Sequence, residues 1–375
     1  MLTVDLSAIR ANVEALRRAA GDVLFMAVVK DNAYGHGLVP VAQAAVEAGA
    51  DWLGIVHVRE GIALRQAGIA SPLLVLGYVP PEEIPAAVQH KLDVPLMNLE
   101  HATLVRAQIP VGQRLRVHLK VETGLQRFGV SERELLELAR FAGFLPSATG
   151  QQSPFVPVGI YSHLAAVEET ELDFTKSQID RFTSACQSLG ADHHGSLVRH
   201  IAATAATLVL PESRFDMVRC GIGVYGLWPS TDVKRLVKND GLLRPALSWT
   251  KPIRALKTVP ADAPVGYGCT WRPARESTVA LLDVGYADGF DRSLSSKAVV
   301  EVNRQTCPVV GRICSNVTFI DVTAVGNVSV GDDVTLISSD PNSPASMDAQ
   351  AERAGTINYE LAMRLSPDLE REYRE

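Results

Sequence analysis

The chain has 375 residues, which is too long for one ordinary domain of about 150 residues and suits a barrel of about 250 residues with a smaller second domain. Hydrophobic residues make up 47% and charged residues 21%, so the chain can fill a core and carries no signature of disorder. The formal net charge of −6 argues against a nucleic-acid-binding protein, which needs a basic surface.

The sequence shows no pattern typical of a targeting signal or a membrane span. The N-terminus carries Asp5 and no basic segment before an apolar run, so we expect no secretory signal. The longest apolar stretches fall far short of the ~20 residues that a membrane-spanning helix needs. Five cysteines are scattered without a CxxC pair, which argues against a disulfide framework and a zinc site. We therefore expect a cytoplasmic protein with no metal centre and no membrane contact.

Through the first 225 residues, short apolar runs alternate with amphipathic helical patterns such as Leu38–Ala48 and Arg59–Ala67. The eight candidate strands are Val23–Lys30, Trp52–His57, Leu73–Gly77, Asp93–Met97, Leu115–Glu122, Val156–Ser162, Leu197–Ile201 and Phe215–Arg219. Apolar strands between amphipathic helices indicate a parallel sheet covered on both faces, and eight such units predict a (β/α)8 TIM-type barrel. The alternative, a doubly wound open sheet, would need a GxGxxG motif after the first strand, where this chain has Lys30 to Gly37.

From about Leu242 the pattern changes to short segments rich in β-branched residues and punctuated by Gly, Pro, Asn and Asp. The expected strands are Leu247–Leu256, Ser277–Val284, Lys297–Val302, Pro308–Ile313, Val317–Val322 and Asp333–Ile337, with helices at Met347–Ala354 and Tyr359–Leu365. We therefore predict a barrel over residues 1–240 and a mostly-β C-terminal domain over residues 241–375. The first few residues could also pair with the β domain.

Lys30 stands at the carboxyl end of the first apolar strand, where barrel enzymes place catalytic groups. Its primary amine could form a Schiff base with a carbonyl compound. From position alone, a lysine that merely reaches water past the strand end is the simpler interpretation.

The residues around Lys30 favour the catalytic interpretation over the simpler one. Ala27-Val-Val-Lys30-Asp-Asn-Ala-Tyr34-Gly-His36-Gly closely resembles the pyridoxal-phosphate (PLP) lysine signature of the alanine racemase family. Further motifs that resemble the family follow in order at Lys120 to Gly129, Tyr161-Ser-His163, Arg199-His200, Arg219-Cys-Gly221-Ile222, Gly266-Tyr267-Gly268, Val284 to Gly289, Gly311-Arg312-Ile-Cys314 and Thr356 to Glu360. The resemblance covers nearly the whole chain.

The resemblance implies a PLP-dependent enzyme that interconverts L-alanine and D-alanine and works as a homodimer with shared active sites. It assigns Lys30 as the residue that holds PLP and as one catalytic base. It assigns Tyr267 as the second base, supplied by the β domain of the partner chain. Two bases are needed because a proton leaves one face of the α-carbon and another arrives on the opposite face.

The same resemblance assigns the cofactor contacts. By the resemblance, Arg219 would lie beside the pyridine nitrogen and be oriented by His200, while His163 would pack against the ring. A guanidinium does not give up its proton, so the ring is a weaker electron sink and transamination is disfavoured. The expected phosphate contacts are Tyr34, Thr204, Gly221, Ile222 and Tyr359.

On the substrate side, the resemblance implies that Arg127 donates to the cofactor and to the substrate carboxylate. Lys120 matches the family lysine that is often carbamylated. The expected substrate-binding residues from the β domain are Tyr286, Arg312 and Ser315. The family usually has Met-Asp where this chain has Ser315-Asn316, and Asn-Ser where it has Ala203-Thr204, so the preferred amino acid stays open.

Three alternatives therefore accompany the alanine racemase hypothesis. One is a racemase of serine or of a broader set of amino acids. Another is a barrel-type PLP decarboxylase, which would need a glutamate in place of Arg219. The third is a PLP-binding homeostasis protein, which lacks a β domain, whereas this chain continues for more than a hundred residues past its barrel.

Overall fold

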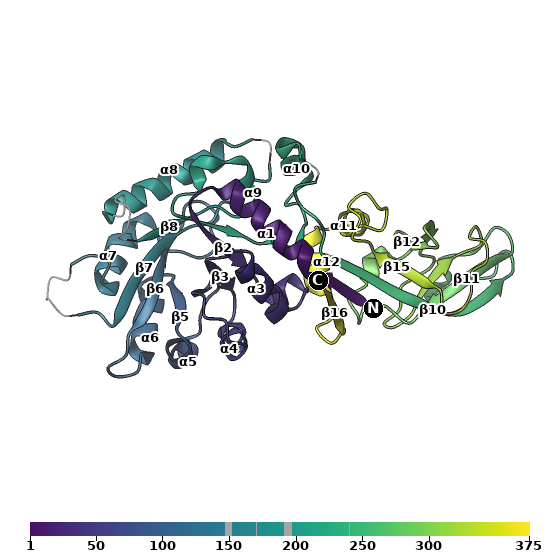
Figure 1. Cartoon of the computed structure of the whole chain (residues 1–375), viewed down its shortest axis with the longest axis horizontal. Helices are drawn as coiled ribbons and strands as arrows, with labels where there is room; N and C mark the ends of the chain where they lie inside the picture. Colours follow the sequence, from purple (N-terminus) through teal and green to yellow (C-terminus); the bar gives the residue numbers. More distant parts are fainter. Residues whose placement is uncertain (147–151, 170, 191–196, 240) are drawn as a thin grey trace.

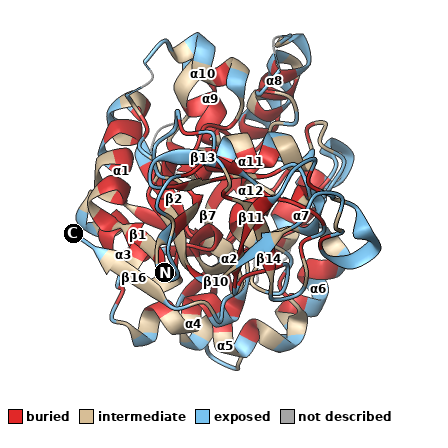
Figure 2. Cartoon of the chain, turned by 90° about the vertical axis from the view of Figure 1, so that its right-hand side faces the viewer, coloured by how far each residue is buried: buried red, intermediate tan, exposed pale blue. Residues whose placement is uncertain are grey.

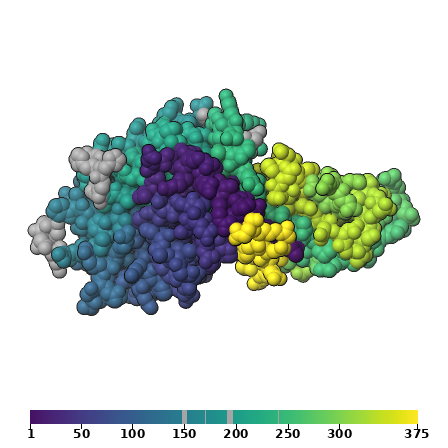
Figure 3. All heavy atoms as spheres, viewed as in Figure 1, coloured from purple at the N-terminus to yellow at the C-terminus, as the bar shows by residue number. Residues whose placement is uncertain are grey.

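The computed structural model of the chain describes residues 1–146, 152–169, 171–190, 197–239 and 241–375. The molecule is elongated, with a helix-covered barrel at one end and a β-rich unit at the other (Figure 1). Both termini lie near the junction of the two, where the C-terminal residues cover part of the N-terminal segment (Figure 3).

The barrel consists of eight parallel strands. They are β2 (Leu24–Val28), β3 (Trp52–Ile55), β4 (Leu73–Val75), β5 (Leu92–Leu96), β6 (Leu115–Lys120), β7 (Phe155–Tyr161), β8 (Val198–His200) and β9 (Met217–Cys220). From β2 to β8 each strand pairs with the next in sequence, and β9 pairs with β2. The ring closes where Arg219 N–H donates to the Ala202 carbonyl at 2.9 Å and Asp216 N–H donates to the Arg199 carbonyl at 3.0 Å. The predicted eight-stranded barrel is confirmed.

Helices surround this barrel. The longer ones are α1 (Leu6–Ala20), α3 (Leu38–Glu47), α4 (Val58–Gln66), α5 (Ile84–Gln89), α6 (Leu99–Gln108), α7 (Glu132–Ala142), α8 (Asp173–Ser188), α9 (Thr204–Val209) and α10 (Thr231–Val237). Short 3-10 turns are η1 (Pro81–Glu83), η2 (Pro211–Ser213) and η3 (Ile222–Tyr225). Buried residues follow the strands and the inner helix faces, and exposed residues lie on loops and outer turns (Figure 2).

The strand side chains alternate between two apolar clusters. Phe25 and Ala27 belong to the main core beneath the helices, whereas Met26 packs with Trp52 and Met217 in a small cluster inside the barrel. This alternation follows from the two-residue period of a strand. The upper part of the barrel interior is left to polar side chains, and the candidate site is built there.

The C-terminal unit is mostly β, as predicted. Its strands are β10 (Leu247–Val259), β11 (Ser277–Leu282), β12 (Val299–Val302), β13 (Gln305–Pro308), β14 (Thr318–Asp321) and β15 (Asp333–Ile337), joined by β1 (Leu2–Asp5) and β16 (Arg371–Arg374) from the chain ends. The sheet order is β13-β12-β15-β10-β1-β16, and β11 pairs with β10 and β14. A 3-10 turn, η4 (Tyr267–Cys269), precedes β11, another, η5 (Arg292–Leu294), precedes β12, and α11 (Met347–Ala354) and α12 (Asn358–Arg364) follow β15.

One expected strand differs from the structure. The strand predicted over Pro308–Ile313 is wrong, because β13 ends at Pro308, which has no N–H, and the chain turns at Gly311 with φ of 68°. The predicted domain boundary at residue 240 falls on Asp240, which lies outside the described residues. Within the described ranges, no helix is long and apolar enough to cross a membrane.

Candidate functional site

A cavity of about 510 Å³ opens at the carboxyl ends of the barrel strands. Ten residues expected from the sequence line it, namely Lys30, Tyr34, Lys120, Arg127, His163, Thr204, Arg219, Gly221, Ile222 and Tyr359. His200 lies directly beneath Arg219. The loops after parallel strands meet at one end of a barrel, so residues far apart in the sequence share one cavity.

A strained turn carries Lys30 into the cavity. The lysine begins α2 (Lys30–Tyr34), whose last four residues, Asp31–Tyr34, adopt left-handed φ values between 50° and 54°. Such a run is costly and needs support from its surroundings. Glu60 supplies it, since its carboxylate accepts the Asp31 N–H at 2.7 Å and the Val56 N–H at 2.8 Å. The Lys30 ammonium lies 3.0 Å from the Asp31 carboxylate.

Arg219 forms the floor of the cavity. Its guanidinium donates to His200 Nδ1 at 2.9 Å, to the Ser162 carbonyl at 2.7 Å and to the Ile201 carbonyl at 3.1 Å. Among the described residues, no carboxylate contacts it. Burial lowers the pKa of Arg219 to about 10, so the group stays protonated at neutral pH.

The rings of Tyr161 and His163 line the cavity beside Arg219 and form one of its walls. The ring of Tyr161 stacks on His200 with centroids 4.9 Å apart, and the guanidinium of Arg219 lies 5.5 Å from the Tyr161 ring centre. On the same side, His163 Nδ1 lies 3.3 Å from Arg219. Burial lowers the pKa of His163 to about 3, and the charge of Arg219 lowers it too, so this imidazole is neutral. The wall therefore presents flat, uncharged rings.

The opposite end of the cavity offers hydroxyl and N–H groups. Thr204 Oγ1 accepts the Gly221 N–H at 3.0 Å, which leaves the hydroxyl hydrogen available to a ligand. Gly221 makes room for Tyr34, because a Cβ at Gly221 would lie 2.7 Å from the Tyr34 hydroxyl. The first N–H groups of η3, which begins at Ile222, have no acceptor within the helix. This arrangement suits an anion.

Two further polar contacts shape the mouth of the cavity. The Tyr359 hydroxyl donates to Glu168 at 3.2 Å, and burial raises the pKa of both groups. Lys120 is buried, and burial lowers its pKa to about 8, with further lowering by the charges of Arg127 and Arg219. Arg127 itself lies exposed at the rim.

The four remaining predicted residues, all from the C-terminal sheet, do not line this cavity. Tyr267 is 72% exposed and stands between Gly266 and Gly268, whose φ values of 71° and 74° form the turn that presents it. The Arg312 guanidinium packs beside this turn, 3.1 Å from where a Cβ at Gly268 would lie. The turn that carries Tyr286 is tied to the segment of Ser315, since Tyr286 N–H donates to the Cys314 carbonyl and Ala287 N–H to the Ser315 carbonyl. These residues form a second cluster, on the surface.

The sequence reasoning missed several cavity residues. They are Phe128, Tyr161, Glu168, Ile357 and Met363. Tyr161 had a signal, because it stands two residues before His163 at the end of an apolar strand. The others lie in loops or in α12 and reach the cavity only through the tertiary fold. Within the described residues, no group of three or more His, Cys, Asp and Glu side chains could hold a metal ion.

Comparisons with known proteins agree with this geometry. The model of the alanine racemase N-terminal domain matches residues 4–229, and that of the alanine racemase C-terminal domain matches residues 246–373. An alanine racemase of Symbiobacterium thermophilum is 40% identical over 99% of this chain and 96% of its own length. One of Methanococcus maripaludis is 37% identical over 99% of this chain and 97% of its own.

Solved structures give the same picture. The alanine racemase of Streptomyces lavendulae superposes with a TM-score of 0.91 at 34% identity, covering 100% of this chain and 96% of that one. The Bacillus anthracis alanine racemase with bound L-Ala-P also reaches 0.91, at 33% identity over 100% and 94% of the two chains. The chain therefore belongs, along its whole length, to the alanine racemase family of PLP-dependent isomerases.

Proposed function

We propose that this protein interconverts L-alanine and D-alanine with PLP as its cofactor. The observation that carries the proposal is the combination of groups in one cavity: the Lys30 amine, the Arg219 floor, the flat His163 wall and an anion-binding end. These groups fit PLP, which presents an aldehyde to an amine, a planar pyridine to a ring and a nitrogen donor, and a phosphate to hydroxyl and N–H groups. Tyr34, Thr204, Gly221, Ile222 and Tyr359 would hold the phosphate.

Bound PLP would withdraw electrons from the α-carbon of an attached amino acid and so acidify its α-proton. Lys30 would take or return that proton on one face of the α-carbon. Arg219, held by His200, would donate a hydrogen bond to the pyridine nitrogen. Because the guanidinium keeps its own proton, the nitrogen would stay unprotonated, which favours simple proton exchange over transamination. Arg127 would bind the substrate carboxylate.

The second base would be Tyr267 of a partner subunit. Its support is geometric, since Tyr267 is exposed on the C-terminal sheet and absent from the cavity of its own chain. A homodimer in which each sheet covers the other chain's barrel would bring Tyr267, Tyr286, Arg312 and Ser315 to the cavity mouth. The barrel, together with Tyr359 of α12, would then serve one active site, and the turns of the C-terminal sheet that carry Tyr267 and Tyr286 would serve the other.

Lys120 would carry a carbamate in this protein. A carbamate forms from a neutral amine and CO2, and the lowered pKa of the buried lysine makes the neutral amine accessible near neutral pH. The resulting carboxylate would fix the neighbouring Arg127 by charge.

The five cysteines, all in described parts of the chain, are free thiols, which supports a reducing compartment such as the cytoplasm.

The test is chiral chromatography of single enantiomers of a panel of amino acids incubated with the purified, PLP-loaded protein. We expect pure L-alanine and pure D-alanine both to reach an equal mixture. Alanine that stays enantiopure in the presence of bound PLP would contradict the proposal. Faster racemisation of serine than of alanine would support a racemase but change its preferred substrate to serine. The Ser315-Asn316 difference from the family would then account for that preference.

A further inference from the structure

A file of buried polar side chains runs through the barrel interior below the cavity. It consists of Arg219 on β9, His200 on β8, His118 on β6 and Asp93 on β5, each at most 4% exposed. We propose that this file is a one-directional hydrogen-bond relay in which Asp93 acts as the remote counter-ion of Arg219 and fixes the guanidinium on the cavity floor. The consequence for PLP rests on the proposed function, whereas the relay itself does not.

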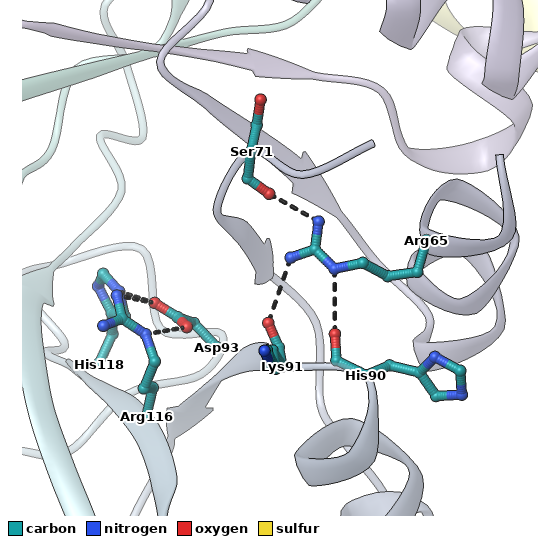
Figure 4. A network of polar contacts seen from close by, with 7 residues as sticks. All are labelled: Arg65, Ser71, His90, Lys91, Asp93, Arg116 and His118. Atoms are coloured by element: carbon teal, nitrogen blue, oxygen red, sulfur yellow. Dashed lines mark hydrogen bonds and ion pairs between the residues drawn. The ribbon is translucent and has the colours of Figure 1, made fainter. Parts of the chain in front are cut away.

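The contacts are continuous. Arg219 lies 2.9 Å from His200 Nδ1, His200 Nε2 lies 3.0 Å from His118 Nδ1, and His118 Nε2 lies 3.4 Å from the Asp93 carboxylate. Asp93 also accepts two hydrogen bonds from Arg116, at 2.7 Å and 3.2 Å. Figure 4 shows this last part of the relay, with His118 and Arg116 both directed at the Asp93 carboxylate.

Because Arg219 can only donate hydrogen bonds, it determines which ring nitrogen carries the proton on His200 and on His118. A guanidinium can only donate, so His200 Nδ1 must be a lone pair and the His200 proton must lie on Nε2. This proton points at His118 Nδ1, which must accept it, so the His118 proton lies on Nε2 as well. His118 can then only donate to Asp93. A single pattern of protons therefore satisfies the whole file, with both imidazoles neutral and the carboxylate ionised.

The charges agree with this pattern. Burial lowers the pKa of His200 and His118, which keeps both rings neutral. Burial alone would raise the pKa of Asp93, but hydrogen bonds from His118 and Arg116 hold it below its ordinary value. A buried cation with only neutral neighbours is unfavourable, and a hydrogen-bonded chain that ends in an anion compensates it because successive bonds polarise one another.

The surroundings are shaped for the relay. A Cβ at Gly159 on β7 would lie 2.6 Å from His118 Nδ1, so a glycine is needed to seat this ring between neighbouring strands. The indole of Trp52 meets His118 edge-on with ring centres 5.6 Å apart. The start of β5 is also anchored, because Arg65 donates to the carbonyls of His90 and Lys91 just before it (Figure 4). Asp93 is thus held at a fixed depth.

The direct test is the proton position on each ring, read by 15N NMR of histidine-labelled protein, with and without PLP, and assigned by single substitutions among the nine histidines. We expect His118 and His200 to be neutral with the proton on Nε2 in both states. A proton on Nδ1 of either ring in the unmodified protein would overturn the relay, and this readout needs neither a variant nor turnover.

Two variants of Asp93 then distinguish the effect of its hydrogen-bond acceptor from the effect of its negative charge. Asp93→Asn keeps an oxygen acceptor, so the tautomers should persist while the affinity for PLP falls about tenfold, the usual scale for losing a carboxylate that orients a histidine. Asp93→Ala also removes the acceptor of the His118 Nε2–H, so the affinity for PLP should fall further than in Asp93→Asn, while Arg219 still keeps the His200 proton on Nε2. The matched control is Asp216→Asn, which breaks the partly buried Arg199–Asp216 pair at the foot of β8 and β9 and should change neither readout.

The outcomes are distinguishable. Unchanged PLP affinity in Asp93→Asn would overturn the counter-ion role, and a folded Asp93→Ala protein that binds PLP no more weakly than Asp93→Asn would overturn the role of Asp93 as the terminal acceptor. If the tautomers are as expected and no amino acid is racemised, the relay stands and the proposed function fails.

Discussion

Among single residues, Arg219 is the one whose charge departs most from what PLP chemistry usually employs. It is a buried cation with neutral acceptors at every described contact, and in the proposed function it would stand where a carboxylate would make the cofactor a stronger electron sink.

Arg219→Glu should therefore redirect the reaction. We expect the racemisation rate to fall by about a hundredfold, the scale for losing one preorganised donor. The formation of pyridoxamine phosphate and pyruvate per turnover should rise, because a protonated pyridine favours transamination. Cofactor absorbance and pyruvate assays measure the partition. A variant that loses activity without a higher share of pyruvate would show that the electronic argument is wrong.

Lys120 gives a second prediction at this scale, with a defined pH dependence. A folded-state pKa of about 8 leaves roughly one lysine in ten neutral at pH 7, and this share rises as the pH passes through 8. Uptake of 13C-bicarbonate should produce a carbamate signal in the carbon NMR spectrum that grows over this pH range. Lys120→Ala should abolish the signal, and a signal that survives would assign the carbamate to another amine.

How much of the site could be predicted differs between its parts. The cavity residues stand in short motifs at strand ends, so Lys30, Arg219 and Gly221 could be named from the sequence. Asp93 and His118 could not, because Asp93 is a single charged residue in an apolar strand and His118 stands between Arg116 and Lys120 in a strand with no motif that singles it out. Only closure of the barrel brings them into one file.

At the scale of elements, the barrel strands were predictable because burial on both faces makes them continuously apolar. The strand β16 was not, since its sequence Arg-Glu-Tyr-Arg has almost no apolar residue and it forms by pairing with β1 at the other end of the chain. Pairing partners 369 residues apart, such as Leu2 and Arg371, leave no local trace in the sequence.

Helix α12, which precedes β16, supports the turn that carries Lys30. Gly35 ends that turn with φ of 80°, and a Cβ there would lie 2.1 Å from the Ala362 carbonyl of α12. Gly35→Ala should lower the free energy of unfolding by about 2–4 kcal/mol, from left-handed strain plus overpacking, and should weaken PLP binding. Denaturant unfolding and PLP titration measure the two effects.

Gly355→Ala is the matched control. This glycine has a similar φ of 74° and no neighbour within 4 Å of an added Cβ, so only the backbone cost of about 1–2 kcal/mol is expected. Equal losses in the two variants would mean that the packing of α12 against the turn contributes nothing.

At the scale of the whole molecule, the residues assigned to the proposed reaction lie in two separate places on one chain. The cavity holds Lys30, and the exposed cluster on the C-terminal sheet holds Tyr267. In the proposed homodimer, a Lys30→Ala chain mixed with a Tyr267→Phe chain should regain one intact site in each heterodimer. We expect the mixture to recover activity that neither variant has alone, measured by racemisation of L-alanine. Inactive mixtures, with subunit exchange confirmed by mass, would argue against a shared site.

The central claim is that Lys30 and Tyr267 act as bases on opposite faces of the substrate, and hydrogen exchange at the α-carbon tests it most directly. Tyr267→Phe, loaded with PLP in deuterated water, is given pure L-alanine or pure D-alanine, and deuterium at the α-carbon is followed by NMR. The family resemblance assigns Tyr267 to the L-enantiomer and Lys30 to the D-enantiomer, so we expect D-alanine still to exchange through Lys30, whereas exchange of L-alanine is lost. Equal exchange of the two enantiomers, or equal loss of both, would contradict the claim.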